Sequence, residues 1–383
     1  MKPGKSLSAS MLIAVLVLSL VLVGCQPAAP AEEKTIKIGF IGPMTGDVKT
    51  FGESTKNGFE LAIAKHNGQA GGYKIVPVIA DDRNDATEAV NVATKLISQD
   101  KVQAIVGSVT TATTIPVSDV ANSKKVVQIT ATATATKVTV DNGTRKEFVF
   151  RACFIDPFQG QVGAKFALDN LKAKTAAVMY DQGNDYTKGL AEVFKTHFEA
   201  GGGQVVAFEA YAKDDNDFSA QLTSIAGKNP DVLYLPDYYQ KVSLIGKQAR
   251  DKGITAPFLG ADGWDSSELD FATMDGGYFT NHYSPEDTRP EVVAWVKEYK
   301  AKHNVEPDAL ATLAYDATNL LLNAIDTAKS NDPVKIKDAL KATKDFAAVS
   351  GKISFDANGD PVKSAAILQI KDGKQKFVTT VNP

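Results

Sequence analysis

The chain has 383 residues, of which 44% are hydrophobic and 23% are charged, and its formal net charge is −3. These are ordinary values for globular proteins, so they exclude a largely disordered, collagen-like or fibrous chain. A net charge so close to zero gives no sign of a basic surface for DNA or RNA, and we expect no nucleic-acid partner. The length allows two or three domains.

The first 24 residues have the three parts of an export signal. Lys2 and Lys5 form a basic start, and an apolar run of 13 residues, with Ser19 as its one polar member, extends from Met11 to Val23. A helix of that length reaches roughly 20 Å, which is short of the ~30 Å hydrocarbon core of a bilayer. The run is therefore typical of a signal peptide and not of a membrane span.

Cys25 follows directly after this apolar run, in the segment LVGC at 22–25. The segment resembles a lipobox, the Leu-x-Gly-Cys pattern that bacteria cleave before an acylated cysteine. We expect cleavage after residue 24, acylation of Cys25 and a tether at 25–34 that Pro27 and Pro30 stiffen. The alternative is an ordinary secretory signal that happens to end in cysteine.

Cys153 is the second of the two cysteines in the chain. If Cys25 carries a lipid, Cys153 has no partner for an internal disulfide, and stability must come from the core. Because Cys153 lies in the apolar run FVFRACF at 148–154, we expect a buried structural thiol and not a nucleophile.

From residue 35 onward, short apolar runs alternate with stretches in which apolar residues recur at helical spacing. In the first part, this pattern predicts strands at 35–41, 74–80, 102–106, 126–129 and 148–151. It predicts helices at 52–67, after Asn84 as a cap, and from a threonine-rich start into 115–122.

The same alternation restarts near residue 155. It predicts strands at 176–180, 204–208, 232–235 and 257–260, and helices at 186–199, 217–227 and 238–252. Strands that alternate with helices indicate parallel sheets built from right-handed crossovers. Since there are too many such units for one comfortable sheet, we expect an α/β fold with two lobes.

The last third of the chain has a different pattern. Helices are expected at 290–303, 306–330 and 332–343. Two strands, at 352–355 and 365–370, are expected to form a hairpin around the turn signal Asn358-Gly359, and a final strand is expected at 375–380.

Enzyme and metal signatures are missing from the sequence. It has no phosphate-binding loop, no dinucleotide fingerprint and no nucleophile elbow, and none of its four histidines has another at zinc-site spacing. The segment 356–360 begins like a calcium loop, but Pro361 and Ile367 occupy its glycine and glutamate positions. We expect no catalytic residues, no metal and no cofactor.

Two hydroxyl-rich segments follow predicted strands. The segment GSVTTATT at 107–114 begins a helix, where free N–H groups and hydroxyls suit a carboxylate; the alternative is a plain threonine cap. The segment TATATAT at 130–136 lies at the carboxyl end of a strand, where open α/β sheets bind ligands. It suits a small zwitterion, although an exposed strand face or low complexity also explains it.

A third segment, GADGWD at 260–265, again follows a strand. Its glycines allow close approach, and Asp262 can pair with an ammonium group, unless the segment is a surface turn. Aromatic residues lie at further strand ends: Phe51, Tyr186, Tyr238 and Tyr239. Each alone is more often a core residue, and they converge only if two lobes face each other.

Together these motifs resemble those of the type I periplasmic binding proteins, and within them the leucine/isoleucine/valine-binding receptors of branched-chain amino acid ABC transporters. The resemblance covers 35–383. It is carried, besides the lipobox, by IGFIGPMTG at 38–46 with Phe51-Gly52, Asp81-Asp82, the Thr111 segment, FIDPFQG at 154–160, YLPDYY at 234–239 and the Asp262 segment. Each motif is weak alone, but their order and spacing are specific.

The resemblance implies two Rossmann-like lobes with parallel sheets and a ligand cleft between them. Three hinge crossings are expected near 153–156, 283–287 and 349–352. The N-terminal lobe would then comprise 35–153 and 285–350, and the C-terminal lobe 154–284 and 351–383.

The resemblance also implies roles for particular residues. Thr111 and Thr134 match positions that bind a ligand carboxylate through hydroxyl and backbone N–H groups, and the carbonyl of Thr132 matches an acceptor for the ligand ammonium. Asp262 matches the acid that pairs with that ammonium. Pocket-wall positions are matched by Phe51, Tyr186 and Tyr238. The family often has Ser at 111, Glu at 262 and Gly at 237, where this chain has Asp237. Because the acid at 262 is shorter than glutamate, the resemblance specifies the ligand's side chain less closely.

The function implied is that of a non-catalytic receptor, expected to be a monomer, which closes on an aliphatic, branched-chain amino acid and delivers it to the permease subunits of an ABC importer. Cys25 would hold it by a lipid at an extracytoplasmic membrane face. Two alternatives stay open. The same fold would bind an amide, urea or aromatic acid, or it would act as a sensory receptor module.

Overall fold

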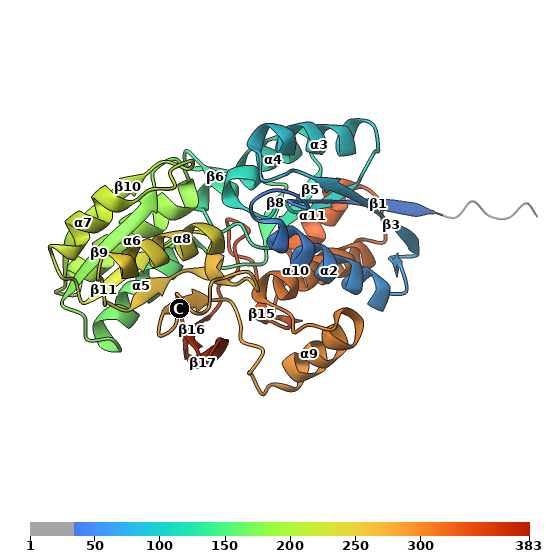
Figure 1. Cartoon of the computed structure of the whole chain (residues 1–383). Coiled ribbons are helices and arrows are strands. Elements are labelled where there is room, and N and C mark those ends of the chain that lie inside the picture. Colours follow the sequence, from blue (N-terminus) through green and yellow to red (C-terminus); the bar gives the residue numbers. More distant parts are fainter. Residues whose placement is uncertain (1–33) are drawn as a thin grey trace, which may run out of the picture. The chain divides into compact units, whose positions relative to one another are not determined.

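Two sheets, each covered by helices on both faces, organise residues 35–383, which form one compact unit (Figure 1). The computed structural model describes residues 34–383. The predicted signal peptide, Cys25 and nearly all of the predicted tether therefore lie outside the described residues.

The first sheet has six strands, which are parallel except for the short edge strand β2. In spatial order they are β2 (Gln69–Ala70), β3 (Tyr73–Asp81), β1 (Thr35–Gly42), β4 (Ala104–Val106), β5 (Val127–Thr130) and β8 (Val149–Arg151). Its helices are α2 (Lys49–Lys65), α3 (Ala86–Ser98), α4 (Thr111–Lys124), α9 (Pro290–His303), α10 (Ala309–Ala328) and α11 (Pro333–Lys341). We call this sheet with its helices the first lobe.

The second sheet has seven strands, and the last two pairings along its edge are antiparallel. In spatial order they are β10 (Gln204–Tyr211), β9 (Thr175–Asp181), β11 (Val232–Leu235), β12 (Phe258–Gly260), β13 (Tyr278–Asn281), β16 (Ala365–Lys371) and β17 (Lys374–Val381). Its helices are α5 (Asp156–Asp169), α6 (Asp185–Ala200), α7 (Ser219–Ala226) and α8 (Tyr239–Asp251). We call this sheet with its helices the second lobe, and the predicted two-lobed α/β fold is confirmed.

Smaller elements complete the described chain. They are the short helices η1 (Thr136–Val138) and η2 (Asp262–Trp264) and the strand pairs β6 (Val140–Asp141) with β7 (Thr144–Arg145), and β14 (Phe346–Ala348) with β15 (Gly351–Ile353).

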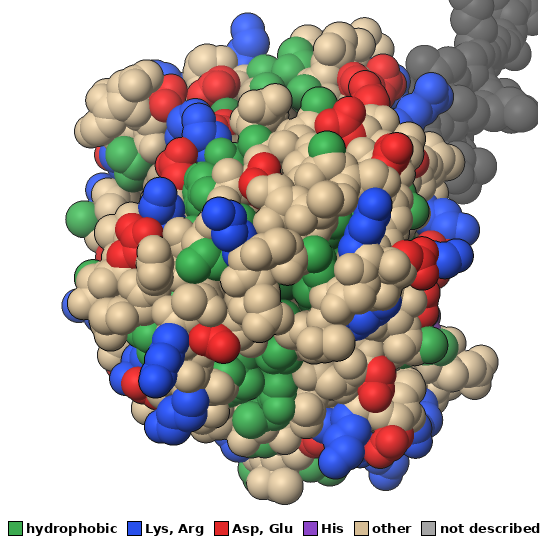
Figure 2. All heavy atoms as spheres, turned by 60° about the vertical axis from the view of Figure 1, so that its left-hand side comes forward, with side chains coloured by type: hydrophobic (Ala, Val, Ile, Leu, Met, Phe, Trp, Pro, Cys, Tyr) green, Lys and Arg blue, Asp and Glu red, His purple; other side chains and the backbone are tan. Residues whose placement is uncertain are grey.

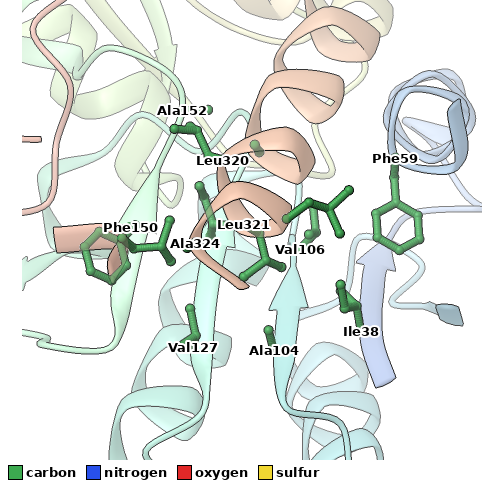
Figure 3. Packing of buried hydrophobic residues seen from close by; sticks show 14 of the residues in the cluster. Ile38, Phe59, Ala104, Val106, Val127, Phe150, Ala152, Leu320, Leu321 and Ala324 are labelled. Atoms are coloured by element: carbon green, nitrogen blue, oxygen red, sulfur yellow. The ribbon is translucent and has the colours of Figure 1, made fainter. Parts of the chain in front are cut away.

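The strands of the first lobe are apolar on both faces because helices cover both. Ile38 and Phe40 of β1 pack in the cluster under α2 and α10, whereas Ile41 packs in a second cluster under α3 and α4. This is why the strands read as continuous apolar runs and not as alternating ones. Figure 3 shows α10, which comes from far along the chain, lying over β4 and β5 with Leu320 and Leu321 directed at the strands.

Cys153 is buried at the end of β8, and the predicted structural thiol is confirmed. Burial raises the pKa of its thiol to about 12. Its Sγ lies 3.3 Å from the carbonyl oxygen of Ala133, which it donates to. A thiol so hard to ionise is a poor nucleophile.

The predicted hairpin near the C-terminus is wrong. Asn358-Gly359 does form a turn, in which Asp356 Oδ1 accepts hydrogen bonds from the N–H groups of Asn358 and Asp360. The strands on either side of this turn do not pair, however: β15 pairs with β14, and β16 pairs with β13 and β17. Burial decides this, because Ile353 packs in the core of the first lobe whereas Ile367 packs in that of the second.

Two boundaries also differ from expectation. Ile353 is buried, and Phe355 partly buried, in the first-lobe core, so the last crossing to the second lobe lies after the expected 349–352. The cap of α3 is Asp85, whose side chain accepts from the N–H of Glu88, and not Asn84. Asn84 has a φ of 56° and belongs to the preceding turn.

The surface gives two further observations. Figure 2 shows basic and acidic side chains interspersed over one face of the molecule, without a patch of either sign. Within residues 34–383, no helix combines the length and the hydropathy that a membrane span requires.

Gly58 lies where α2 packs against α10. A Cβ atom at this position would lie 2.1 Å from the carbonyl oxygen of Ala311 and 3.0 Å from the backbone nitrogen of Tyr315. These are backbone atoms of a buried helix, so the only relief is to separate the two helices.

We therefore expect Gly58→Ala to lower the free energy of unfolding by about 1–3 kcal/mol or more, which urea denaturation measures. The matched control is Gly189→Ala in α6, where the nearest atom, Oδ2 of Asp156, lies 3.8 Å from the added Cβ. That control should be neutral or stabilise by up to about 1 kcal/mol. Equal effects from both substitutions would contradict the close packing of α2 on α10.

Candidate functional site

A cavity lies between the two lobes, at the carboxyl ends of their strands. It is lined by Phe51, Val109, Thr110, Thr111, Thr132, Thr134, Tyr186, Tyr238, Asp262, Gly263 and Leu310. All seven ligand-binding residues expected from the sequence are among them. The structure thus brings together residues that are spread over most of the chain.

Four lining residues were not singled out from the sequence. Val109, Thr110 and Gly263 belong to segments that were singled out, so only the individual residues were missed. Leu310 comes from the first turn of α10. No local pattern marks it, because it reaches the cavity only through the return of α10 to the first lobe.

The first lobe supplies hydrogen-bond donors to the cavity. Thr111 is the first residue of α4, and the side chain of the capping residue, Thr110, makes no capping bond. The Thr110 hydroxyl donates to Oδ1 of Asn84 at 2.7 Å instead. The plain threonine cap is therefore not what forms, and the first N–H groups of α4 lack that partner.

Thr111 and Thr134 present hydroxyl oxygens that are buried without a hydrogen-bond partner among the described residues. A buried polar group left in that state costs about 1–3 kcal/mol, so such groups call for an explanation. Thr132 differs, because its hydroxyl donates to the carbonyl of Val109 at 2.6 Å. The donors that the first lobe supplies to the cavity fit an anion such as a carboxylate.

The second lobe supplies an acid to the cavity. Asp262 begins η2 and is only 8% exposed, so the alternative of a surface turn is wrong. Its Oδ1 accepts hydrogen bonds from the Tyr186 hydroxyl at 2.7 Å and from Nε2 of Gln159 at 2.9 Å. Its Oδ2 lies 3.1 Å from Nε2 of His282.

His282 is the one basic side chain within ion-pair distance of Asp262 among the described residues. Burial lowers the pKa of this imidazole below its usual value, so the ring is uncharged near neutral pH. The carboxylate of Asp262 therefore faces the cavity with hydrogen-bond donors around it but without a permanent positive charge. A cationic group in the cavity would supply that charge.

Aromatic and aliphatic side chains form the walls. The rings of Tyr186 and Tyr238 stack with centroids 5.2 Å apart, and Phe51 meets Tyr238 edge-on at 5.8 Å. Val109 and Leu310 add apolar surface from the first lobe. Burial raises the pKa of both tyrosines, so each hydroxyl keeps its proton and can donate.

Asp237, where the family often has glycine, lies behind this wall. Its Oδ1 accepts from the N–H of Tyr238 at 2.7 Å, and its Oδ2 accepts from the Tyr211 hydroxyl at 2.6 Å. Burial raises the pKa of Asp237 to about 6. The carboxylate thus fixes the backbone that carries Tyr238 and does not line the inner cavity.

The two lobes touch across the cleft. The Tyr239 hydroxyl donates to the carbonyl of Asp47 at 3.1 Å, and the hydroxyls of Thr50 and Ser266 lie 3.0 Å apart. Asp265 of the second lobe accepts at 2.8 Å from the N–H of Ala309, at the start of α10. These bonds hold the cavity in a closed arrangement.

Comparison with known proteins agrees with this geometry. The model of the family described as "Periplasmic binding protein" matches residues 35–375. The Leu/Ile/Val-binding protein BraC3 of Rhizobium johnstonii is 34% identical, over 90% of this chain and 93% of its own.

Two solved structures are similar over the whole described fold. The leucine-binding protein LivK of Thermotoga maritima has a TM-score of 0.86 and 39% identity, and the match covers 91% of this chain and 99% of that one. The branched-chain amino acid transporter substrate-binding protein LivJ of Streptococcus pneumoniae, in complex with isoleucine, has a TM-score of 0.84 and 34% identity, covering 91% and 100%. The chain therefore belongs to the periplasmic binding protein family, among relatives named for leucine, isoleucine and valine.

Proposed function

We propose that the protein is the substrate-binding protein of an ABC importer, that it binds one aliphatic, branched-chain amino acid between its lobes, and that it hands this ligand to the permease subunits. One observation carries the proposal. Unpartnered donors at Thr111 and Thr134 lie in the same cavity as Asp262, a carboxylate without a permanent countercharge. The carboxylate of a zwitterion would accept from the donors, its ammonium group would pair with Asp262, and the apolar walls suit its side chain.

The ligand's two charged groups take different partners in this proposal. The carboxylate accepts from the hydroxyls of Thr111 and Thr134 and from the N–H groups at the start of α4, where the helix dipole favours negative charge. The ammonium donates to Asp262 and to the carbonyl of Thr132. Phe51, Val109 and Leu310 contact the aliphatic side chain.

The same chemistry supports binding without catalysis. The lining residues that titrate are Tyr186, Tyr238 and Asp262. Both tyrosines keep their protons because burial raises their pKa, and Asp262 already accepts from Tyr186 and Gln159.

An amino acid is favoured over the alternative of an amide, urea or aromatic acid. A ligand without an ammonium group would enclose Asp262 without an opposite charge, and a buried charge left without its partner costs on the order of 3–5 kcal/mol. A sensory receptor would use the same site. It would differ only in which partner protein binds the closed form.

In this proposal, the lobes close and open by hinge motion at the chain crossings between them, near 153–156, near 283–287 and after Phe355. Such crossings absorb hinge motion while the lobes stay rigid. We further propose that the mature protein is a monomer, held by an acylated Cys25 at an extracytoplasmic membrane face.

The binding roles predict an order of effects. Asp262→Ala should weaken the binding of an aliphatic amino acid roughly a hundredfold or more, because the ligand ammonium loses its buried partner. Thr111→Ala should cost less, about 1.5–3 kcal/mol, because the N–H donors at the start of α4 remain. Calorimetric titration of both variants against the wild type measures this order.

The matched control is Thr114→Ala, in the same helix. Its hydroxyl is also buried and unpartnered, but Thr114 does not line the cavity, so the affinity should not change. Unaltered affinity in Asp262→Ala, with the wild type binding, would remove the proposed ammonium site.

The lipid anchor predicts a processing defect. Cys25→Ser should leave an uncut precursor that takes up no labelled fatty acid, because the thiol that receives the lipid is gone. Metabolic labelling and electrophoretic mobility measure both effects, and Cys153→Ser serves as the control that is processed normally. A Cys25→Ser chain that is cleaved to a soluble product would show an ordinary secretory signal.

A further inference from the structure

His282 contacts the acid of the site without lining the inner cavity itself. It follows β13, where the chain leaves the second sheet, and is 4% exposed. Nε2 of its ring lies 3.1 Å from Oδ2 of Asp262. The ring stacks on Phe154, with centroids 3.7 Å apart.

The protonation of this ring follows from its neighbours. An ionised carboxylate only accepts hydrogen bonds, so the nitrogen that faces Asp262 carries the proton. Nδ1, the other nitrogen, is buried and has no partner among the described residues, as a ring with a single N–H allows. His282 therefore meets Asp262 as a neutral donor and leaves the carboxylate its negative charge.

The contact completes the set of bonds that orient Asp262. Tyr186 and Gln159 both donate to Oδ1, and His282 is the donor to Oδ2. With one oxygen held by two donors and the other by one, the carboxylate plane is fixed before a ligand arrives. The short acid of this chain has less reach than glutamate, so its orientation matters more.

The ring also connects two crossings between the lobes. Phe154 follows β8 at the end of the first sheet, and His282 follows β13 of the second. Because the two rings stack, the donor to Asp262 is held in place by the region where the lobes are joined and not by a surface loop.

We propose that His282 is a positioning residue of the ammonium site: its neutral imidazole donates to Asp262 Oδ2 and thereby sets the carboxylate for an α-ammonium group. This inference rests on the proposed function and adds to it a residue that acts through Asp262. The ring need not touch the ligand.

A double-mutant cycle with Asp262 tests this role. In calorimetric titrations with leucine, His282→Leu should weaken binding at least tenfold, since a hydrogen bond to a charged group is lost. His282→Gln, whose amide can place an N–H near the position of Nε2, should stay within about threefold of the wild type. In an Asp262→Asn background, His282→Leu should add less than about threefold, because coupled residues are not additive.

The possible outcomes separate this inference from the proposed function. If the wild type binds no amino acid, the proposed function fails. If the wild type binds and Asp262→Asn weakens binding, but His282→Leu matches the wild type or its effect is the same in both backgrounds, only the positioning role fails. Should His282→Leu not fold by circular dichroism, His282→Phe keeps the stack on Phe154, removes the donor and takes its place in the cycle with the same expected loss.

Discussion

The fold and the site depend on one constraint: a small molecule with two opposite charges must find a partner for each when the cavity closes around it. Asp262 is a buried carboxylate, and His282, the one basic side chain within ion-pair distance of it among the described residues, is uncharged near neutral pH. The hydroxyls of Thr111 and Thr134 are buried donors without acceptors. Each of these arrangements is costly by itself. In the function proposed here, they complement the ammonium and the carboxylate of one amino acid, and the cost becomes a source of selectivity.

The two-lobed architecture places these opposed groups. Parallel strands end at one edge of each sheet, and the helices that follow begin there, so α4 brings its N-terminus from the first lobe and η2 brings Asp262 from the second. The return of α10 adds Leu310, and its first N–H, that of Ala309, donates to the carboxylate of Asp265 across the cleft. Burial, together with the nearby Asp265 carboxylate, raises the pKa of Asp308, the residue that caps the same helix. In this arrangement, acids of both lobes lie together at the start of α10.

The sequence predicted what depends on local pattern. Apolar runs and helical spacing located the strands that the segments around Thr111, Thr134 and Asp262 follow. That these segments meet across a cleft between two lobes was implied by the family resemblance. Packing between distant segments was not predictable in this way. Leu310 and His282 reach the site only through the return of α10 and the position of β13, and neither has a motif around it. The hairpin prediction failed for the same reason, since the turn at Asn358-Gly359 is local but burial of Ile353 in the other lobe decides which strands pair.

The most direct test of the account is a calorimetric titration of the chain from Gln26 onward with leucine and two analogues that each lack one charge. Leucine methyl ester keeps the ammonium and loses the carboxylate, and 4-methylpentanoate keeps the carboxylate and loses the ammonium. Leucine should bind at a single site, and each analogue should bind roughly a hundredfold or more weakly, because one buried group of the closed cleft then has no partner. Binding of 4-methylpentanoate as tight as that of leucine would contradict the account, since Asp262 would then have no charge to meet.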